Sequence, residues 1–403
     1  MTKTWHIITC EYPPQVGGVS DHTRLLAQNL CHAGDEVHVW APENKNAQTC
    51  CKPDVVVHRT LGDFSPKNLE RTRDMIAAVP GRYSEVFVQW VPHGYGYHAM
   101  NVGFCRWLER LRSGGYTITL MVHEPGLEPH GSFKQRTVAT VHRYMVRTLL
   151  RAVTRVFIAI PAWEHYLRPL APSETQFEWL PIPSSVPVSA NSQDVLALRG
   201  EFKAEFLVGH LGTYGKQGSS LLASVLAEVL TGISNCHVSL LGRGNNQFSE
   251  VFLREFPQFT GRVHSSGILS ERDLSRHLFA CDLMLQPYID GLSTRRTSLM
   301  NALSHGLPVV SNIGHLSETL WNDSGAVCVG PVSSLGERSL ALLRDAAARQ
   351  EIAQRGLALY SSRFAWSRIV AQIRSARTQS LALPSPTLTH RSSLAELHAH
   401  SCR

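Results

Sequence analysis

One stretch of the sequence decides the fold of this chain: residues 287–310, PYIDGLSTRRTSLMNALSHGLPVV. The apolar run before it, Leu283–Gln286, predicts a strand, and a glycine loop follows. Ser293 or Thr294 suits the N-cap of the next helix, and Gly306 is suited to end that helix before another buried strand. A strand, a loop, a helix and a strand in this order are typical of a parallel α/β sheet.

The start of this helix is a candidate anion site. The first amides of a helix have no partners within it, and the helix dipole is positive there. Arg295 and Arg296 place two cations in the predicted first turn, where they oppose the dipole if no ligand is bound. No acidic residue guards that turn, which favours a bound phosphate group. Two solvated surface arginines are the alternative.

Composition limits the classes of protein. A chain of 403 residues suggests two domains, and 43% apolar with 18% charged residues fits a soluble globular protein. The net charge of +7 favours an anionic partner: a nucleotide, a membrane surface or a nucleic acid. The nine cysteines form no metal-type Cys-x-x-Cys pair, and no apolar run reaches the roughly 18 residues of a membrane span. We therefore expect a cytoplasmic protein, with peripheral binding to the inner face of the membrane as an option.

The amino-terminal half begins with a strand at 5–10, a helix at 21–33 and a strand at 36–40. Gly17 and Gly18, in the first loop, allow close approach of the backbone to a ligand. A flexible helix start is the alternative. The dinucleotide fingerprint Gly-x-Gly-x-x-Gly is missing from this half, which disfavours an NAD-dependent oxidoreductase.

Polar loops follow two further predicted strands, at 85–90 and 116–122. They contain His93, His123 and Glu124, which are candidate ligand groups because parallel strands end at one edge of a sheet. No third matching ligand accompanies a His-Glu pair, so we do not predict a metal site.

A basic stripe lies on the predicted helix at 133–155. Its arginines recur at spacings of seven and four, which places them within one broad face: Arg136, Arg143, Arg147 and Arg151. Such a face can dock on anionic lipid, and a solvated charged face is the alternative.

The second half repeats the alternation after a proline-rich boundary at 180–188. A strand at 206–211 leads to a glycine loop at 212–218 and a helix at 220–230. Lys216 in this loop, and Arg243 between two later glycines, can reach a phosphate group, although the Walker spacing is missing. The alternative is that both are exposed loop cations. We expect two doubly wound domains that face one another with ligands between them.

Taken together, these motifs resemble the glycosyltransferases of family four (glycosyl transferases group one), retaining enzymes of the GT-B fold. The resemblance covers about residues 5–375 and rests on five segments in order: EYPPQVGGV at 11–19, VGHL at 208–211, GILSE at 267–271, GLPVV at 306–310 and FAW at 364–366.

The chain departs from the family pattern at the donor helix. Two glutamates eight positions apart are usual there, and these positions are Ser293 and Asn301. The arginine that usually contacts phosphate is His210. Asp290 could then take over a contact to the sugar, while Arg295 and Arg296 supply the missing positive charge.

The resemblance implies an α/β GT-B protein with two facing Rossmann-like domains and an interdomain cleft. The expected parts are an acceptor domain at 1–183, a donor domain at 184–365, a helix at 366–378 that packs back on the first domain, and a flexible tail at 379–403. The implied catalytic residues are His123, Glu124, Lys216 and Asp290. The implied donor-binding residues are Gly17, Gly18, His210, Gly212, Arg243, Ser293, Arg295, Arg296, Thr297, Ser298 and Asn301.

The implied activity is that of a retaining, metal-independent hexosyltransferase. It moves a sugar from a nucleotide-diphosphate sugar, its co-substrate, to a glycan, lipid-linked or small-molecule hydroxyl, and it uses no cofactor. A non-catalytic nucleotide-sugar-binding relative and a nucleotide-sugar epimerase are the alternatives. We expect no nucleic-acid partner, because the positive charge is scattered and no recognition module accompanies it.

Overall fold

The computed structural model describes residues 2–43, 55–80, 84–96, 99–126, 132–153 and 155–375. They form two compact units. Unit 1 holds the chain up to Pro181 and again from Ile369, and unit 2 holds Ile182–Arg368. The predicted tail at 379–403 lies outside the described residues.

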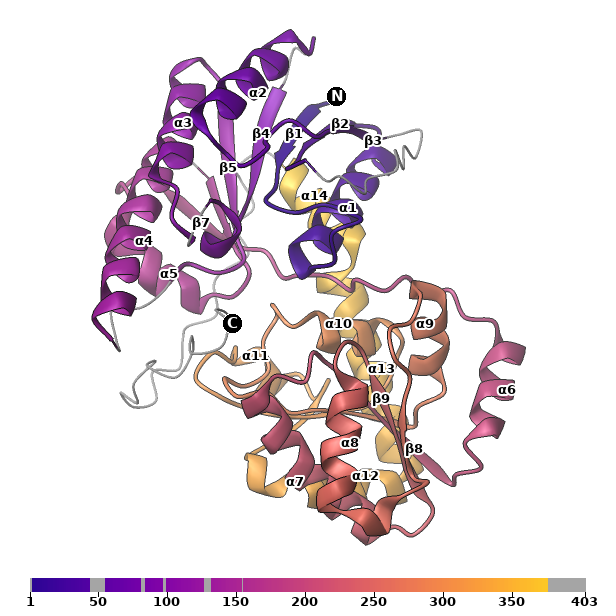
Figure 1. The fold of residues 1–403 in the computed structure, drawn as a ribbon. Coiled ribbons are helices and arrows are strands. Elements are labelled where there is room, and N and C mark those ends of the chain that lie inside the picture. Colours follow the sequence, from indigo (N-terminus) through magenta and orange to yellow (C-terminus); the bar gives the residue numbers. More distant parts are fainter. Residues whose placement is uncertain are drawn as a thin grey trace. The chain divides into compact units, whose positions relative to one another are not determined.

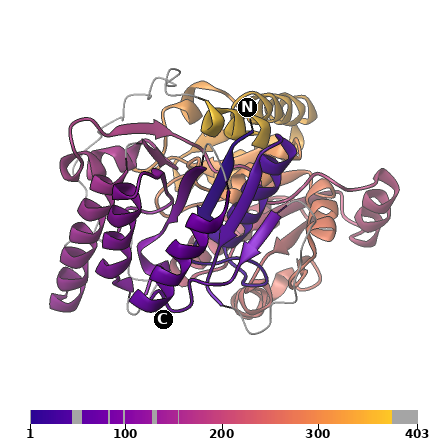
Figure 2. The ribbon, with the colours of Figure 1, turned by 90° about the horizontal axis from the view of Figure 1, so that it is seen from above.

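Unit 1 is built on a parallel sheet of seven strands in the order β3-β2-β1-β4-β5-β6-β7. Figures 1 and 2 show helices α2, α3 and α4 on one face of this sheet and α1 on the other. The strands are β1 (Thr4–Ile8), β2 (Glu36–Trp40), β3 (Val55–His58), β4 (Ser84–Trp90), β5 (Thr117–Val122), β6 (Arg155–Ile158) and β7 (Gln176–Trp179). The helices are α1 (Gly18–His32), α2 (Pro66–Ala78), α3 (Val102–Ser113), α4 (Phe133–Ala152) and α5 (Ala162–Leu167).

Unit 2 is built on a second parallel sheet, of six strands in the order β10-β9-β8-β11-β12-β13. The strands are β8 (Phe206–Leu211), β9 (Cys236–Leu241), β10 (Val263–Ser265), β11 (Leu283–Gln286), β12 (Val309–Asn312) and β13 (Cys328–Gly330). The helices are α6 (Ser192–Glu201), α7 (Lys216–Gly232), α8 (Asn245–Glu255), α9 (Glu271–Phe279), α10 (Thr297–Ser304), α11 (Leu320–Asp323), α12 (Leu335–Arg344) and α13 (Ala346–Leu359), and α14 (Trp366–Arg374) leads back to unit 1.

The predicted parallel α/β architecture is confirmed in both units. In β1 and β11 every residue is buried, as expected for strands covered on both faces. Because all paired strands run in the same direction, their carboxyl ends lie at one edge of each sheet, and the loops that carry the candidate residues follow these ends.

Several predicted helix limits were wrong. Helix α1 begins at Gly18 rather than at residue 21, and α7 begins at Lys216, which the sequence placed in the preceding loop. Helix α4 ends at Ala152 instead of residue 155, since the backbone of Val153 is extended. Strand β6 begins at Arg155.

Arg155 ties helix α14 to unit 1. Its Nε lies 2.6 Å from Oε1 of Glu178, and both side chains are about nine-tenths buried, with exposed fractions of 9% and 10%. Its terminal nitrogens also donate to the backbone oxygens of Gln372 and Ile373, each at 3.0 Å. These oxygens lie at the carboxyl end of α14, where a helix lacks donors of its own. Arg374 adds an ion pair to the buried Asp35 at 2.8 Å.

We predict that Arg155→Met lowers the free energy of unfolding by about 3–5 kcal/mol, because Glu178 would stay buried without its cation. Chemical denaturation measures this change. Arg73→Met is the control, since Arg73 pairs with Glu70 on the surface and such pairs contribute about 0–1 kcal/mol. Equal effects of the two substitutions would contradict this role of Arg155.

Candidate functional site

Helix α10 starts later than the sequence predicts. It begins at Thr297, and Arg296 occupies the N-cap position without a side-chain cap, so the predicted capping role of Ser293 or Thr294 is wrong. The reason is a distant carboxylate: the backbone nitrogen and hydroxyl of Thr294 donate to Oε1 of the buried Glu318 at 3.0 and 2.5 Å. The hydroxyl of Ser293 is also buried, and it has no hydrogen-bond partner within the described part of the chain.

An acidic residue lies against the two arginines. Asp290, on the loop after β11, forms ion pairs with both Arg295 and Arg296. The carboxylate is 3% exposed, whereas the arginine side chains are 16% and 28% exposed. Burial opposes the ionisation of Asp290, but the guanidinium groups of Arg296 and Arg295 outweigh it and lower the pKa of the carboxyl group. The expectation that no acidic residue guards the helix start is therefore wrong, because Asp290 pairs with both arginines there.

The loop that carries this cluster is held on several sides. The guanidinium carbon of Arg296 lies 4.8 Å from the ring centroid of Tyr288, whose hydroxyl is 2.8 Å from that of Ser298. Gly291 has a positive φ of 85°, and a Cβ there would lie 2.1 Å from the backbone nitrogen of Gly314. Only glycine fits such a close approach of two backbones. The arginines are thus presented by a fixed loop.

Asn301 is engaged by the segment that enters unit 2. Its Oδ1 accepts hydrogen bonds from the backbone nitrogen of Ser185 at 2.8 Å and from the hydroxyl of Ser184 at 2.9 Å. The backbone nitrogen of Val186 lies 3.3 Å from the same oxygen. The residue is 2% exposed. The structure therefore gives its amide a structural role, and contact with a donor stays a prediction.

His210 supplies no positive charge at neutral pH. It is buried at the end of β8, and its Nδ1 lies 2.8 Å from the backbone oxygen of Leu285. Burial lowers the pKa of His210 to about 4. Gly212 follows, and its backbone oxygen would lie 2.3 Å from a Cβ on Gly242, so the two glycine loops meet backbone to backbone. The side chains of Lys216, at the start of α7, and Arg243, shortly after β9, are exposed to solvent.

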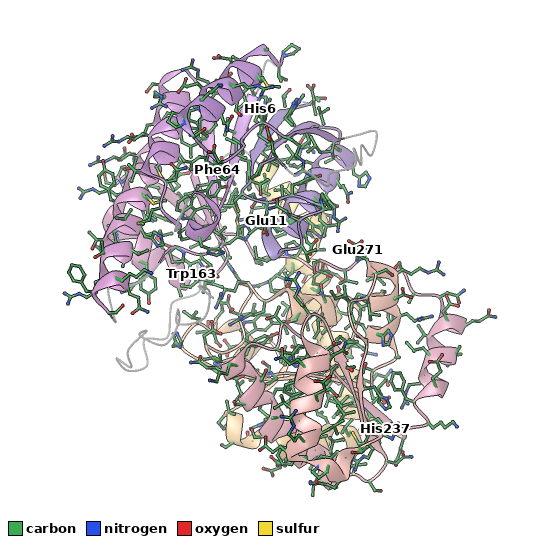
Figure 3. The ribbon with its side chains drawn as sticks, viewed as in Figure 1. His6, Glu11, Phe64, Trp163, His237 and Glu271 are labelled. Carbon is green, nitrogen blue, oxygen red and sulfur yellow. The ribbon has the colours of Figure 1, made fainter. Side chains whose placement is uncertain are left out.

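The first loop of unit 1 contains an acid whose role the sequence did not reveal. Glu11, labelled in Figure 3, lies on the loop after β1, and its Oε1 accepts from the backbone nitrogen of Ser20 at 2.9 Å in the first turn of α1. A Cβ on Gly17 would lie 2.1 Å from that carboxylate oxygen, whereas one on Gly18 would have nothing within 4 Å. Because Gly17 has no Cβ, the carboxylate of Glu11 fits beside it.

The His-Glu pair at the end of β5 belongs to a larger polar group. Nε2 of His123 lies 2.7 Å from Oε1 of Gln89, and Nε2 of Gln89 lies 3.2 Å from Nδ1 of His22. Glu124 pairs with His93 at 3.6 Å. Gln89 and His22 were not among the residues predicted from the sequence. A glutamine inside the otherwise apolar end of β4 was the available signal for the first.

The predicted site residues fall into two sets. Unit 1 carries Gly17, Gly18, His93, His123 and Glu124, and unit 2 carries the remaining predicted residues. Within the described ranges, no group of three or more His, Cys, Asp or Glu side chains could hold a metal ion. No helix in the same ranges is long and apolar enough to span a membrane.

We predict that Gly17→Ala displaces the carboxylate of Glu11 and costs about 1 kcal/mol of stability, the usual effect of losing a helix cap. Gly18→Ala is the matched control. It meets no neighbour and replaces glycine inside α1, so it is expected to leave the stability unchanged or raise it. Thermal unfolding and the exchange rate of the Ser20 amide measure the two effects, and a loss in Gly18→Ala alone would refute the assignment.

Known structures of similar fold cover almost the whole chain. Sucrose-phosphate synthase from Thermosynechococcus elongatus matches with a TM-score of 0.71 and 16% identity, over 92% of this chain and 97% of that chain. Anabaena HepE in complex with UDP-glucose matches with a TM-score of 0.67 and 15% identity, over 92% and 98%. WaaG, a glycosyltransferase involved in lipopolysaccharide biosynthesis, matches with a TM-score of 0.64 and 14% identity, over 92% and 98%.

In sequence, neither a family model nor a curated protein matches the chain. The likeness to the solved structures therefore concerns the fold, and it extends over both units. The chain has the GT-B fold, as the resemblance in sequence implied.

Proposed function

We propose that the protein is a glycosyltransferase that takes a sugar from a nucleotide-diphosphate donor bound by unit 2. The observation that carries this proposal is the pair Arg295 and Arg296, presented together at the start of α10 on a fixed loop. The fold supports it, because similar structures include a sucrose-phosphate synthase, a glycosyltransferase and a protein in complex with UDP-glucose.

The donor diphosphate would bind where the arginines meet the first turn of α10. The amides of Thr297 and Ser298 lie in this turn, and hydrogen bonds from guanidinium to phosphate oxygens are strong because both partners are charged. A diphosphate carries more negative charge than the single carboxylate of Asp290, so it would compete well for the two guanidinium groups. Lys216 would add a further positive charge. His210 would bind as a neutral group, since burial lowers its pKa to about 4.

In the proposed reaction the configuration at the sugar carbon is retained. The bond from this carbon to the diphosphate oxygen breaks, and a bond to the acceptor oxygen forms on the same face. The acceptor proton passes to the departing diphosphate, so the step needs no side-chain nucleophile and no metal. The arginines would lower the barrier by stabilising the charge on the leaving group. His123 would contact the sugar or position the acceptor, with Glu124 beside it.

A non-catalytic nucleotide-sugar-binding protein is the second candidate. Two observations favour it: the family glutamate positions are Ser293 and Asn301, and the amide of Asn301 is engaged by Ser184 and Ser185. Mass spectrometry of the protein mixed with nucleotide sugars and glycan acceptors separates the candidates. A transferred sugar identifies an enzyme, and unchanged donor with measurable binding identifies a binder.

We predict that the double substitution of Arg295 and Arg296 by Ala weakens nucleoside-diphosphate binding at least about tenfold, a loss of roughly 1.4 kcal/mol. Asp290→Asn is expected to tighten binding, because it removes the competing carboxylate. Calorimetric titration with UDP, GDP and ADP measures both effects.

The matched control is Arg272→Ala, in the same unit, since this arginine is 72% exposed and pairs with Asp194 on the surface. Unchanged affinity in the double variant would remove the arginines from the site and with them the basis of the proposed function.

We further propose that the acceptor side includes an anionic membrane surface contacted by α4. Four arginines of this helix are exposed, and the helix contains no acidic residue: Arg136, Arg143, Arg147 and Arg151. Phe133, its first residue, is 87% exposed and could enter the headgroup region. An exposed basic stripe with an apolar tip has the chemistry of a helix that lies on anionic lipid.

We predict that Arg143→Glu, Arg147→Glu and Arg151→Glu together abolish co-sedimentation with vesicles that contain phosphatidylserine. Each basic residue near such a surface contributes about 1 kcal/mol. A control with the same net charge replaces three exposed arginines of unit 2 by glutamate: Arg254, Arg272 and Arg355. Equal losses in the two variants would mean that overall charge, and not α4, governs binding.

A further inference from the structure

A buried glutamine joins two histidines in unit 1. Gln89 lies near the carboxyl end of β4 and is 0% exposed. Its side-chain oxygen is 2.7 Å from Nε2 of His123, which follows β5, and its side-chain nitrogen is 3.2 Å from Nδ1 of His22 on α1. The two imidazole rings meet edge to face, with centroids 4.9 Å apart. Three elements of one unit therefore contribute to a single polar group.

Both histidines are neutral at pH 7. Burial lowers the pKa of His22 to about 4, and burial together with the neighbouring His22 lowers the pKa of His123 well below its usual value. A neutral imidazole has one donor nitrogen and one acceptor nitrogen. Which nitrogen of His123 donates is therefore decided by the partner that Gln89 offers it.

Gln89 offers an acceptor to His123 and a donor to His22. With the amide in this orientation, Oε1 accepts and Nε2 of His123 carries the proton in the 2.7 Å contact. Its amide nitrogen donates to Nδ1 of His22. The single ring proton of neutral His123 is then donated to Gln89, and Nδ1 of His123 can only accept a hydrogen bond. No described residue forms a hydrogen bond with that nitrogen.

The backbone of His123 is also held by hydrogen bonds. Its backbone nitrogen donates to the oxygen of Trp90 at 3.0 Å. Its backbone oxygen accepts from the indole nitrogen of Trp163 at 3.1 Å, and Figure 3 labels this tryptophan. Gln89 is fixed in the same manner, because the buried hydroxyl of Tyr95 donates to its backbone oxygen at 2.5 Å. His22 is 2% exposed, whereas His123 is partly exposed and ends the chain of contacts.

We propose that Gln89 is a positioning residue that holds His123 in the Nε2–H form, so that Nδ1 accepts a hydrogen bond from a hydroxyl group of the ligand. The ligand class that fits a neutral acceptor of this kind is a hydroxyl-rich molecule such as the sugar of a donor or an acceptor glycan. This step rests on the proposed function. It does not depend on where the diphosphate binds, because every residue of the group belongs to unit 1.

The experiment is long-range proton–nitrogen NMR of the full-length protein labelled with ¹⁵N-histidine, which reports the protonated nitrogen of each imidazole. We expect the Nε2–H form for His123. His210 is the internal reference for the opposite form, because its Nδ1 faces the backbone oxygen of Leu285 at 2.8 Å. An Nδ1–H form of His123 would overturn the proposal.

Two variants separate positioning from mere packing. Gln89→Glu keeps an acceptor for Nε2–H of His123, so Nε2 is expected to stay protonated, even where the added carboxylate raises the pKa of the ring. Gln89→Met removes the acceptor at similar size and is expected to give a mixture of the two forms, while the spectrum of His210 stays unchanged. A single Nε2–H form in both variants would overturn the role of Gln89. If Gln89→Met does not fold, the spectra of the wild type and of Gln89→Glu still decide the case, because a deprotonated Nε2 in Gln89→Glu contradicts the role of Gln89.

Adding UDP-glucose to the same samples tests the partner of Nδ1. Its signal is expected to move in the wild type and in Gln89→Glu and to move less in Gln89→Met, with UDP alone as the control. An unmoved signal in the wild type would overturn the assignment of a sugar hydroxyl as partner. The spectra without ligand do not use donor binding, so the proposed function and this inference can fail separately.

Discussion

The arrangement of the proposed donor site depends on one buried carboxylate. Asp290 is almost fully enclosed and stays ionised because two guanidinium groups outweigh the cost of burial. It therefore keeps Arg295 and Arg296 side by side when no ligand is present. Other contacts, between Tyr288 and Ser298 and between Gly291 and Gly314, hold the loop that carries the arginines. A ligand that replaces Asp290 must compete with its carboxylate for two cations that the loop already presents together.

Two other carboxylates lie near helix starts, one in each unit. At the start of α1 the carboxylate of Glu11 accepts from the backbone nitrogen of Ser20, as the carboxylate of Glu318 accepts from Thr294 ahead of α10. Helix starts and their preceding loops attract anions, and this protein supplies its own at each of these places. The three carboxylates differ in one respect. Of the three, only Asp290 is paired with arginines. A polyphosphate that replaced its carboxylate would therefore bind two positively charged side chains.

The architecture could be predicted because it is a local property of the sequence. Apolar runs such as Leu283–Gln286, and the glycine that ends the following helix, predict strand, loop and helix from neighbours within a few residues. The site could be predicted only in part, because its details are set by contacts between distant residues. Thr294 does not cap α10 because Glu318, which lies 24 positions later, takes its donors. Asn301 is held by Ser184, more than a hundred positions earlier. No spacing rule reveals such partners.

The most direct test of the account is a crystal structure of the protein with the nucleoside diphosphate that it binds most tightly. We expect the guanidinium groups of Arg295 and Arg296 to donate to the diphosphate oxygens, with the amides of Thr297 and Ser298 facing the same group. A diphosphate bound elsewhere, with both arginines still paired to Asp290 as in the free protein, would contradict the account.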